Sequence, residues 1–302
     1  MKTDLLARPT VELPSFNGRV SHTAYSVAYR RTFTNIPFSR EFFQILEMIN
    51  GPFDPTEKAL ADSDPTLFPL FESRYILTDM LLREQSAKQI IEIASGLSPR
   101  GLIWTSDRNV QYIETDLYPE AMLKRDIVQR ARLRNEDVLG YDNHFIESAN
   151  AAQSGALSGL ALRYFDEVTP IHFTCEGLLR YLNWVDKRVL GNEIRECLAC
   201  YGADNGSWIT PDLEFLDDAD ATPESRERYD MTAQQWKFDV RPFLFKNLAH
   251  ARDFFERELG FRVKVHSHLS IANQLSCPAR LGLSKEAVEA DLSKRYTFVM
   301  TI

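Results

Sequence analysis

The sequence predicts an α/β fold built on a seven-stranded, mostly parallel sheet with helices on both faces. Three observations lead to this prediction. From residue 89 onward, short apolar segments alternate with segments of helical periodicity, the pattern of repeated strand–helix–strand units. The first apolar segment runs into a tight turn that contains a glycine. The last two expected strands are separated by a helix, which suits a final strand inserted antiparallel.

Length and composition describe an ordinary globular protein. The chain has 302 residues, of which 44% are hydrophobic and 26% are charged, enough to form a full core. The formal net charge is -8 and the basic residues are scattered, which argues against binding to nucleic acid or to an anionic membrane. Four cysteines, a start without an apolar leader and the lack of a bilayer-spanning apolar run predict a cytoplasmic protein.

The pattern divides the chain into two parts, the second of which contains an insertion. Residues 1–85 are expected to form an N-terminal helical cover, with a loop at 50–70 followed by a helix at 71–85. Residues 86–302 are expected to form the sheet domain. Within it, residues 211–246 are polar and too long for a simple connection, so we expect an insertion or lid between the fifth and sixth strands.

The elements of the sheet domain can be placed in order. We expect strands at 89–94, 110–114, 143–146, 170–175 and 207–210, a sixth within 261–269 and a seventh within 296–302. Helices are expected at 119–134, at 184–201, in a segment that ends at Gly260, and near 284–294.

The turn after the first expected strand, "QIIEIASGLSPRG", limits the ligands that the fold could bind. Ligands of open parallel sheets bind beyond the carboxyl ends of the strands. A dinucleotide turn has three glycines, whereas the matching positions here are Ala94, Gly96 and Pro99, and no GK[ST] sequence of a Walker loop follows a strand. Glu92, Ala94 and Gly96 instead match the E-x-[GA]-x-G turn of class I S-adenosylmethionine methyltransferases, whose cofactor has no phosphate.

The second expected strand ends in two carboxylates, Glu114 and Asp116. They lie about 20 residues beyond Gly96, where nucleoside-binding folds place the acid that accepts hydrogen bonds from ribose hydroxyls. Carboxylate oxygens suit a cis-diol because each is a strong acceptor. The alternative is that Asp116 only caps the helix at 119–134 or the turn before it.

Four segments together carry a family resemblance: "IIEIASGLSPRGL", "YIETDLYPEAMLKR", "HFTCEGLLRYL" and the upstream "ESRY". They resemble the leucine carboxyl methyltransferase family, and in particular its bacterial branch of tetracenomycin-type polyketide O-methyltransferases. The resemblance runs from about residue 23 to the C-terminus. It implies a Rossmann-like class I methyltransferase fold, S-adenosyl-L-methionine as the cofactor, and O-methylation of a small-molecule acceptor.

The resemblance implies roles for four residues. Arg74 would grip the methionine carboxylate of the cofactor, a task that suits a planar bidentate donor. Gly96 would let the methionine part lie against the backbone, and Asp116 would bind the ribose. Glu176 of the E-G-L-L sequence would lie at the methionine end. Alternatively, Arg74 could pair only with Asp79 or Glu72, and Glu176 could cap the following helix.

Two further assignments depart from the family pattern. Asn150 and Ala151 stand where the family often has Asp-Leu for adenine recognition, although an asparagine carbonyl can still accept from the adenine amino group. Arg31 matches a basic position near the cofactor, and the neighbouring Arg30 leaves the register open.

Acceptor, base and metal residues are less clearly marked. Tyr25, Tyr29 and Tyr181 could line an acceptor pocket or simply pack. The candidates for a general base are His22, His144 and His172. Lone histidines are more often structural, so we assign no catalytic base. We expect no metal site, because the single Cys-x-x-Cys at 197–200 lies in a helical pattern.

The expected function is O-methylation of a carboxylic acid or phenol on a small, polyketide-type molecule. A carboxylate is already anionic at neutral pH and needs no base, whereas a phenol with a pKa near 10 would benefit from one. Three rivals are a protein C-terminal carboxyl methyltransferase, a catalytically silent cofactor-binding regulatory protein, and a nicotinamide oxidoreductase, which Pro99 disfavours. The sequence names neither the acceptor nor the oligomeric state.

Overall fold

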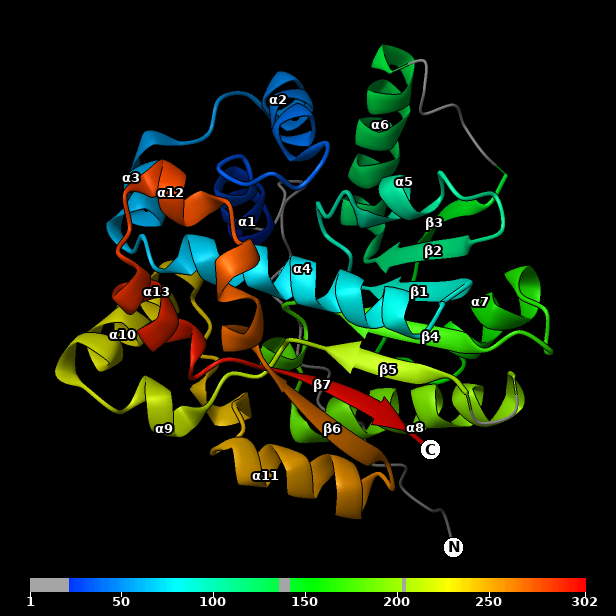
Figure 1. The fold of residues 1–302 in the computed structure, drawn as a ribbon. Coiled ribbons are helices and arrows are strands. Elements are labelled where there is room, and N and C mark those ends of the chain that lie inside the picture. The colour runs from blue at the N-terminus through cyan, green and yellow to red at the C-terminus, as the bar shows by residue number, and fades with distance from the viewer. Residues whose placement is uncertain (1–21, 136–141, 203–204) are drawn as a thin grey trace, which may run out of the picture.

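A single seven-stranded sheet forms the centre of the computed structural model, which describes residues 22–135, 142–202 and 205–302 (Figure 1). The strand order is β3-β2-β1-β4-β5-β7-β6. In chain order the strands are β1 Gln89–Ile93, β2 Gln111–Asp116, β3 His144–Ser148, β4 Ile171–Cys175, β5 Ser207–Thr210, β6 Arg262–Ser267 and β7 Tyr296–Thr301. β7 pairs antiparallel with β5 and β6, and the other pairs are parallel. The predicted fold class is confirmed.

The helices fall into groups along the chain. Before the sheet come α1 His22–Arg31, α2 Ser39–Asn50, α3 Pro55–Ser63 and α4 Leu67–Glu84. Between the parallel strands lie α5 Arg100–Trp104, α6 Tyr118–Arg134, α7 Ala156–Tyr164, the 3₁₀ turn η1 Leu179–Tyr181 and α8 Trp184–Cys200. Between β5 and β6 lie α9 Leu216–Ala219, α10 Pro223–Trp236, the 3₁₀ turn η2 Arg241–Phe243, and α11 Leu248–Asp253, which continues as the π-helical turn η3 Phe254–Glu258. The 3₁₀ helix η4 His268–Gln274, α12 Cys277–Leu281 and α13 Lys285–Leu292 precede β7.

Two hydrophobic layers cover the sheet, one on each face. Ile91 and Ile113 pack with the residues of α7 and α8, while Ile90 and Tyr112 pack with α4 on the opposite face. All four side chains are fully buried. Burial on both faces explains why the central strands are continuous apolar segments rather than alternating ones.

The loop predicted at residues 50–70 is wrong, because α3 and the first turn of α4 lie within it. Asp54 caps α3 by accepting hydrogen bonds from the backbone N–H groups of Thr56 and Glu57, and Pro55 occupies the first helical position. Proline and aspartate are both favoured at a helix start. The prolines mark a helix start here, and they do not break the structure.

The parallel strands point toward one end of the molecule, where α1, α2 and α3 gather together with α9 and α10 of the 211–246 segment (Figure 1). This end contains the carboxyl ends of β1, β4 and β5, the region in which open parallel sheets bind ligands. Among the described residues, no helix combines the length and the apolar character that crossing a bilayer requires.

Candidate functional site

The turn after β1 is strained and tied to the end of β2. Ala94 and Gly96 both adopt left-handed backbone angles, with φ of 51° and 48°. The N–H of Ser95 donates to the Thr115 carbonyl at 2.9 Å, and the N–H of Gly96 donates to Asp116 Oδ2 at 2.8 Å. A left-handed alanine costs about 1–2 kcal/mol, and strain of this kind concentrates at functional sites. The turn is therefore held in a fixed shape at the centre of the sheet edge.

Asp116, the last residue of β2, caps the turn before α6, as the alternative interpretation proposed, and its carboxylate can still accept further hydrogen bonds. Its Oδ1 accepts from the N–H of Leu117 at 2.8 Å, which fixes the turn before α6. Burial raises its pKa, and the N–H groups of Gly96 and Leu117 act in the opposite direction. Each carboxylate oxygen accepts one bond and can accept another. The side chain is thus aimed by the backbone and could still bind a diol.

Glu92 and Glu114 belong to the interior. The Glu92 carboxylate accepts from Arg100 and, at 2.9 Å, from the Tyr112 hydroxyl. Glu114 lies 3.3 Å from Lys124 and 3.4 Å from His144; burial alone would raise its pKa, but these neighbours lower it to about 2. Both side chains are at most 2% exposed. Their burial argues against the predicted contact with the cofactor, and we omit both from the proposed site.

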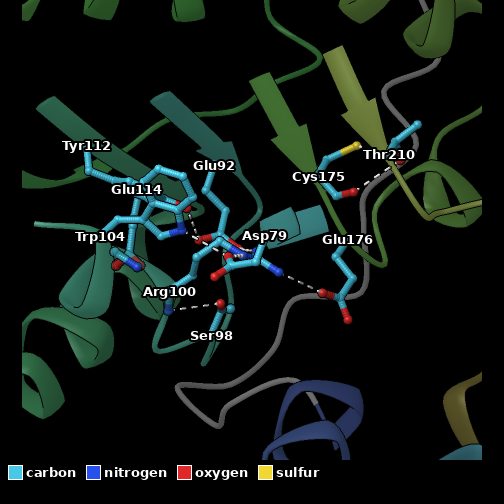
Figure 2. A network of polar contacts seen from close by, with 12 residues as sticks. Asp79, Glu92, Ser98, Arg100, Trp104, Tyr112, Glu114, Cys175, Glu176 and Thr210 are labelled. Carbon is cyan, nitrogen blue, oxygen red and sulfur yellow. Dashed lines mark hydrogen bonds and ion pairs between the residues drawn. The ribbon is translucent and has the colours of Figure 1, made fainter. Parts of the chain in front are cut away.

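Glu176, which follows β4, joins two arginines from distant parts of the chain. Its Oε1 lies 2.9 Å from Nη2 of Arg31 in α1, and its Oε2 lies 3.7 Å from Nη2 of Arg100. Figure 2 shows Arg100 reaching toward Asp79 and Glu92 as well as toward this carboxylate. The Glu176 side chain therefore does not cap the next helix, contrary to the alternative interpretation.

Of the two neighbouring arginines in α1, only Arg31 extends to the strand ends. Arg30 instead donates to the carbonyl of Ala61 at 3.0 Å, within the helical cover. The Tyr75 ring lies between two guanidinium groups, 5.6 Å from that of Arg31 and 4.3 Å from that of Arg100. The packing of α1 thus decides which of the two arginines, Arg30 or Arg31, lies near the strand ends.

Arg74 of α4 reaches the same end of the sheet from the other side. Its Nη2 lies 3.4 Å from Oε1 of Glu214, a residue that follows β5. Neither of the alternative partners takes it: Asp79 pairs with Arg100, and Glu72 accepts from the backbone of residues 276 and 277. Within the described part of the chain, Arg74 is therefore a buried guanidinium with one long ion pair, to Glu214.

Several buried polar atoms near these strand ends have no hydrogen-bond partner among the residues that the structure describes. They are Nε of Arg31, Nε of Arg74, Oε2 of Glu176 and Oδ1 of Asp212. An unsatisfied buried polar atom costs about 1–3 kcal/mol, so a ligand that satisfies such atoms gains binding free energy. Similar atoms occur elsewhere in the described residues, but these four include both acidic and basic groups near the ends of β4 and β5, a combination that suits a polar ligand with a negative and a positive group.

Asn150 and Ala151 follow β3, at the same edge of the sheet. The N–H of Ala149 donates to the Asp116 carbonyl at 2.9 Å, which brings the end of β3 beside the end of β2. The Asn150 side chain is exposed and accepts from the Ala152 N–H at 3.0 Å. Ala151 is buried at 8% exposure. Both residues are placed where they could flank a ligand held by Asp116.

The three tyrosines predicted for the acceptor separate into two groups. Tyr25 stacks on Phe53 at 4.8 Å and donates to the Gly51 carbonyl, and Tyr29 donates to Asp62 at 2.9 Å. Both belong to the aromatic core of the helical cover, which favours the packing alternative for them. Tyr181 lies in η1 and packs near Phe238 beside α10. Only Tyr181 remains close to the 211–246 segment.

The candidate bases are placed away from the strand ends or are not described. His144 is bound to Arg132 and lies against Glu114, and His172 Nδ1 lies 3.0 Å from Ser207 Oγ, where burial lowers its pKa to about 4. The side chain of His22 lies outside what the structure describes.

Four charged residues near the carboxyl ends of β1, β4 and β5 were not predicted from the sequence: Arg100, Arg180, Asp212 and Glu214. A usable signal was present for two of them. Asp212 and Glu214 follow β5 as Glu176 follows β4, so an acid directly after a parallel strand is the shared pattern. Arg100 and Arg180 have no such mark, because their roles depend on partners that are distant in the chain.

No family model matches the chain, and no curated protein matches it. Among solved structures, the methyltransferase domain of bacterial CtHen1 aligns at 11% identity over 76% of this chain and 98% of that chain, with a TM-score of 0.43. A Nostoc punctiforme protein provisionally named an O-methyltransferase aligns at 10% identity over 78% of this chain and 58% of its own, with a TM-score of 0.48. Geranyl diphosphate C-methyltransferase from Streptomyces coelicolor aligns at 9% identity over 75% and 78%, with a TM-score of 0.45. Values this low describe a distant likeness.

Proposed function

We propose that the chain is an S-adenosylmethionine-dependent methyltransferase. The observation that carries this proposal is the set of Arg31, Arg74 and Glu176, each with a side chain at most 10% exposed, at the same end of the sheet as the Gly96 turn and Asp116. The methionine part of S-adenosylmethionine carries a carboxylate, which could bind a guanidinium group, and an ammonium group, which could bind a carboxylate side chain. A ribose carries a diol, which matches the aimed carboxylate at the end of β2.

The residues fit this cofactor on four points. Arg74 has a free Nε and a long contact to Glu214, so it has donors left for a ligand carboxylate. Glu176 keeps one oxygen without a hydrogen bond. A Cβ on Gly96 would come no closer than 3.9 Å to a protein atom, the Cβ of Ala24, so the turn has room for a ligand, and its positive φ favours glycine. Asp116 would bind the ribose.

The bound cofactor would supply a methyl group on a positively charged sulfur, ready for transfer to a nucleophile. The residues of this chain would align the reactants and exclude water, and these two effects account for most of the rate acceleration in such a displacement. α1 carries Arg31 to the site, and α10 lies over the same end of the sheet (Figure 1).

We further propose O-methylation of a carboxylate or phenol on a small, polyketide-type acceptor. A carboxylate fits the site better, because it needs no base and both described candidate histidines lie elsewhere. This finer assignment, and membership of the bacterial branch of the leucine carboxyl methyltransferase family, rest on the sequence motifs. A cytoplasmic location and a small-molecule partner are parts of the same proposal.

Calorimetry with S-adenosylmethionine and with NAD tests the proposal. We expect binding of S-adenosylmethionine and no binding of NAD. Glu176→Ala should weaken the binding at least tenfold, because a charge-assisted contact is lost. Glu147→Ala removes a carboxylate of β3 that pairs with Arg125 at the surface and serves as the matched control. Binding of NAD without a response to S-adenosylmethionine would overturn the assignment.

A further inference from the structure

Glu214 joins three parts of the molecule that are far apart in the chain. Its carboxylate accepts hydrogen bonds from Arg74 of α4, Arg180 of η1 and Tyr229 of α10, at 3.4, 2.7 and 3.1 Å. The side chain is 11% exposed. Burial would raise its pKa, but Arg180 and Arg74 lower it to about 2, so the carboxylate is ionised throughout the neutral range.

The three bonds are unequal, and the inequality leaves Arg74 available. Arg180 and Arg74 both contact Oε1, but the contact with Arg180 is much shorter. Tyr229 supplies a donor to the other oxygen, Oε2. With both oxygens of Glu214 satisfied, Arg74 is held only loosely and keeps donors for a second carboxylate.

Two adjacent side chains of α10 make polar contacts beyond the helix, while the neighbouring Asp230 pairs with Arg241 inside the 211–246 segment at 2.8 Å. Arg228 pairs with Asp64 of the helical cover at 2.7 Å, but the two side chains are 47% and 23% exposed, so this ion pair contributes little. The Tyr229 hydroxyl, by contrast, bonds to a buried carboxylate, an interaction that loses little to solvent. Tyr229 therefore makes a buried polar contact between α10 and the residues that follow β5.

We propose that Tyr229 is a positioning residue that couples closure of α10 to cofactor binding at Arg74, through the Glu214 carboxylate that both contact. This inference rests on the proposed function, and specifically on Arg74 as the ligand of the methionine carboxylate. When α10 moves away, Glu214 loses a donor and draws Arg74 closer, which lowers the affinity for the cofactor. Because coupling between two equilibria is reciprocal, cofactor binding must also favour the closed position of α10.

Calorimetry with S-adenosylhomocysteine on the wild type and on Tyr229→Phe provides the first test. The variant removes only the hydroxyl, and we expect an affinity about fivefold weaker or more, the lower bound of typical coupling. Tyr164→Phe is the matched control, because it also removes a tyrosine hydroxyl bonded to a carboxylate, that of Glu147 in β3. The control should bind as the wild type does.

Hydrogen exchange across residues 223–236 of the wild type provides the second test and needs no variant. Exchange should slow on addition of S-adenosylhomocysteine. If the wild type does not bind this ligand, the proposed function fails, and the coupling fails with it. If the wild type binds it, either unchanged affinity in Tyr229→Phe or unchanged exchange in α10 overturns the coupling alone.

Discussion

At the scale of single residues, the site consists of charged side chains. Their residue types can be read from the sequence, but the partners that they contact cannot. Asp116, Arg74 and Glu176 could be selected because their residue types and their places near strand ends suit a polar ligand. The hydrogen bond from Gly96 to Asp116 crosses 20 residues of chain, and the Arg31–Glu176 ion pair crosses 145. The first pairing depends on how β1 lies beside β2 and the second on how α1 lies over the sheet, and neither is recorded in a local pattern.

Asp116→Ala tests the proposed ribose ligand, whose carboxylate is held in place by two backbone N–H groups. We expect at least tenfold weaker binding of S-adenosylmethionine, about 1.4 kcal/mol, because a charged acceptor for the ribose is lost. The measurement is calorimetry, with a thermal melt to confirm that the variant folds. Asp107→Ala is the control, since Asp107 caps a surface turn before β2, at the opposite end of that strand. Unchanged affinity in Asp116→Ala would remove the residue from the site.

At the scale of elements, helix α5 shows how close packing places the turn after β1. The N–H of Gly101 donates to Glu114 Oε1 at 3.2 Å, so the first turn of α5 rests directly on β2. A Cβ at position 101 would lie 2.6 Å from Oε1 of Glu114 and 2.6 Å from Nε2 of His144. The buried Glu114, Lys124 and His144 group thus serves as the base on which the turn is built.

Gly101→Ala should destabilise the protein by about 1–3 kcal/mol, the usual cost of forcing a methyl group into a packed interior. Gly159→Ala in α7 makes the same change where a Cβ meets nothing within 4 Å, and it should stabilise by about 0.5–1 kcal/mol. Urea denaturation of both variants measures the difference. Equal stability of the two variants would mean that α5 does not pack on Glu114 as described.

At the scale of the whole molecule, burial keeps His172 and His268 neutral in the described interior. His268 lies between Ser73 and Thr297, and its pKa is lowered to about 3 by burial and by the nearby Arg74 and Arg295. His172 contacts Ser207, and burial lowers its pKa to about 4. Both groups must take up protons when the chain unfolds in mild acid, so the fold as a whole becomes sensitive to pH.

The sign of this sensitivity follows from the two pKa values. Between about pH 6.5 and pH 4 the unfolded chain binds more protons than the native one, so the stability conferred by the neutral histidines is complete above pH 6.5 and falls as the pH falls. We expect the free energy of unfolding to decrease as the pH falls through this window, with a slope that approaches about 1.4 kcal/mol per pH unit for each histidine near pH 5. Urea titrations from pH 7 to pH 5 measure it.

His268→Gln should remove one of these two contributions and flatten the dependence on pH. His250→Gln, at a half-buried position in α11, controls for the substitution itself. A variant at position 268 with the same pH slope as the wild type would show that His268 does not remain neutral in the native protein.

The sequence by itself determined the fold class, the strand positions to within a few residues, and the residue types that gather beyond the strands. It could do so because apolar periodicity and strand-end polarity are local properties. The tertiary structure decided which of those residues share a site. It turned Glu92 and Glu114 inward, gave Arg31 rather than Arg30 to Glu176, and brought Arg100, Arg180 and Glu214 into the cluster. The physical reason is that a buried charge must find its partner, and partners are set by the packing of whole helices against the sheet.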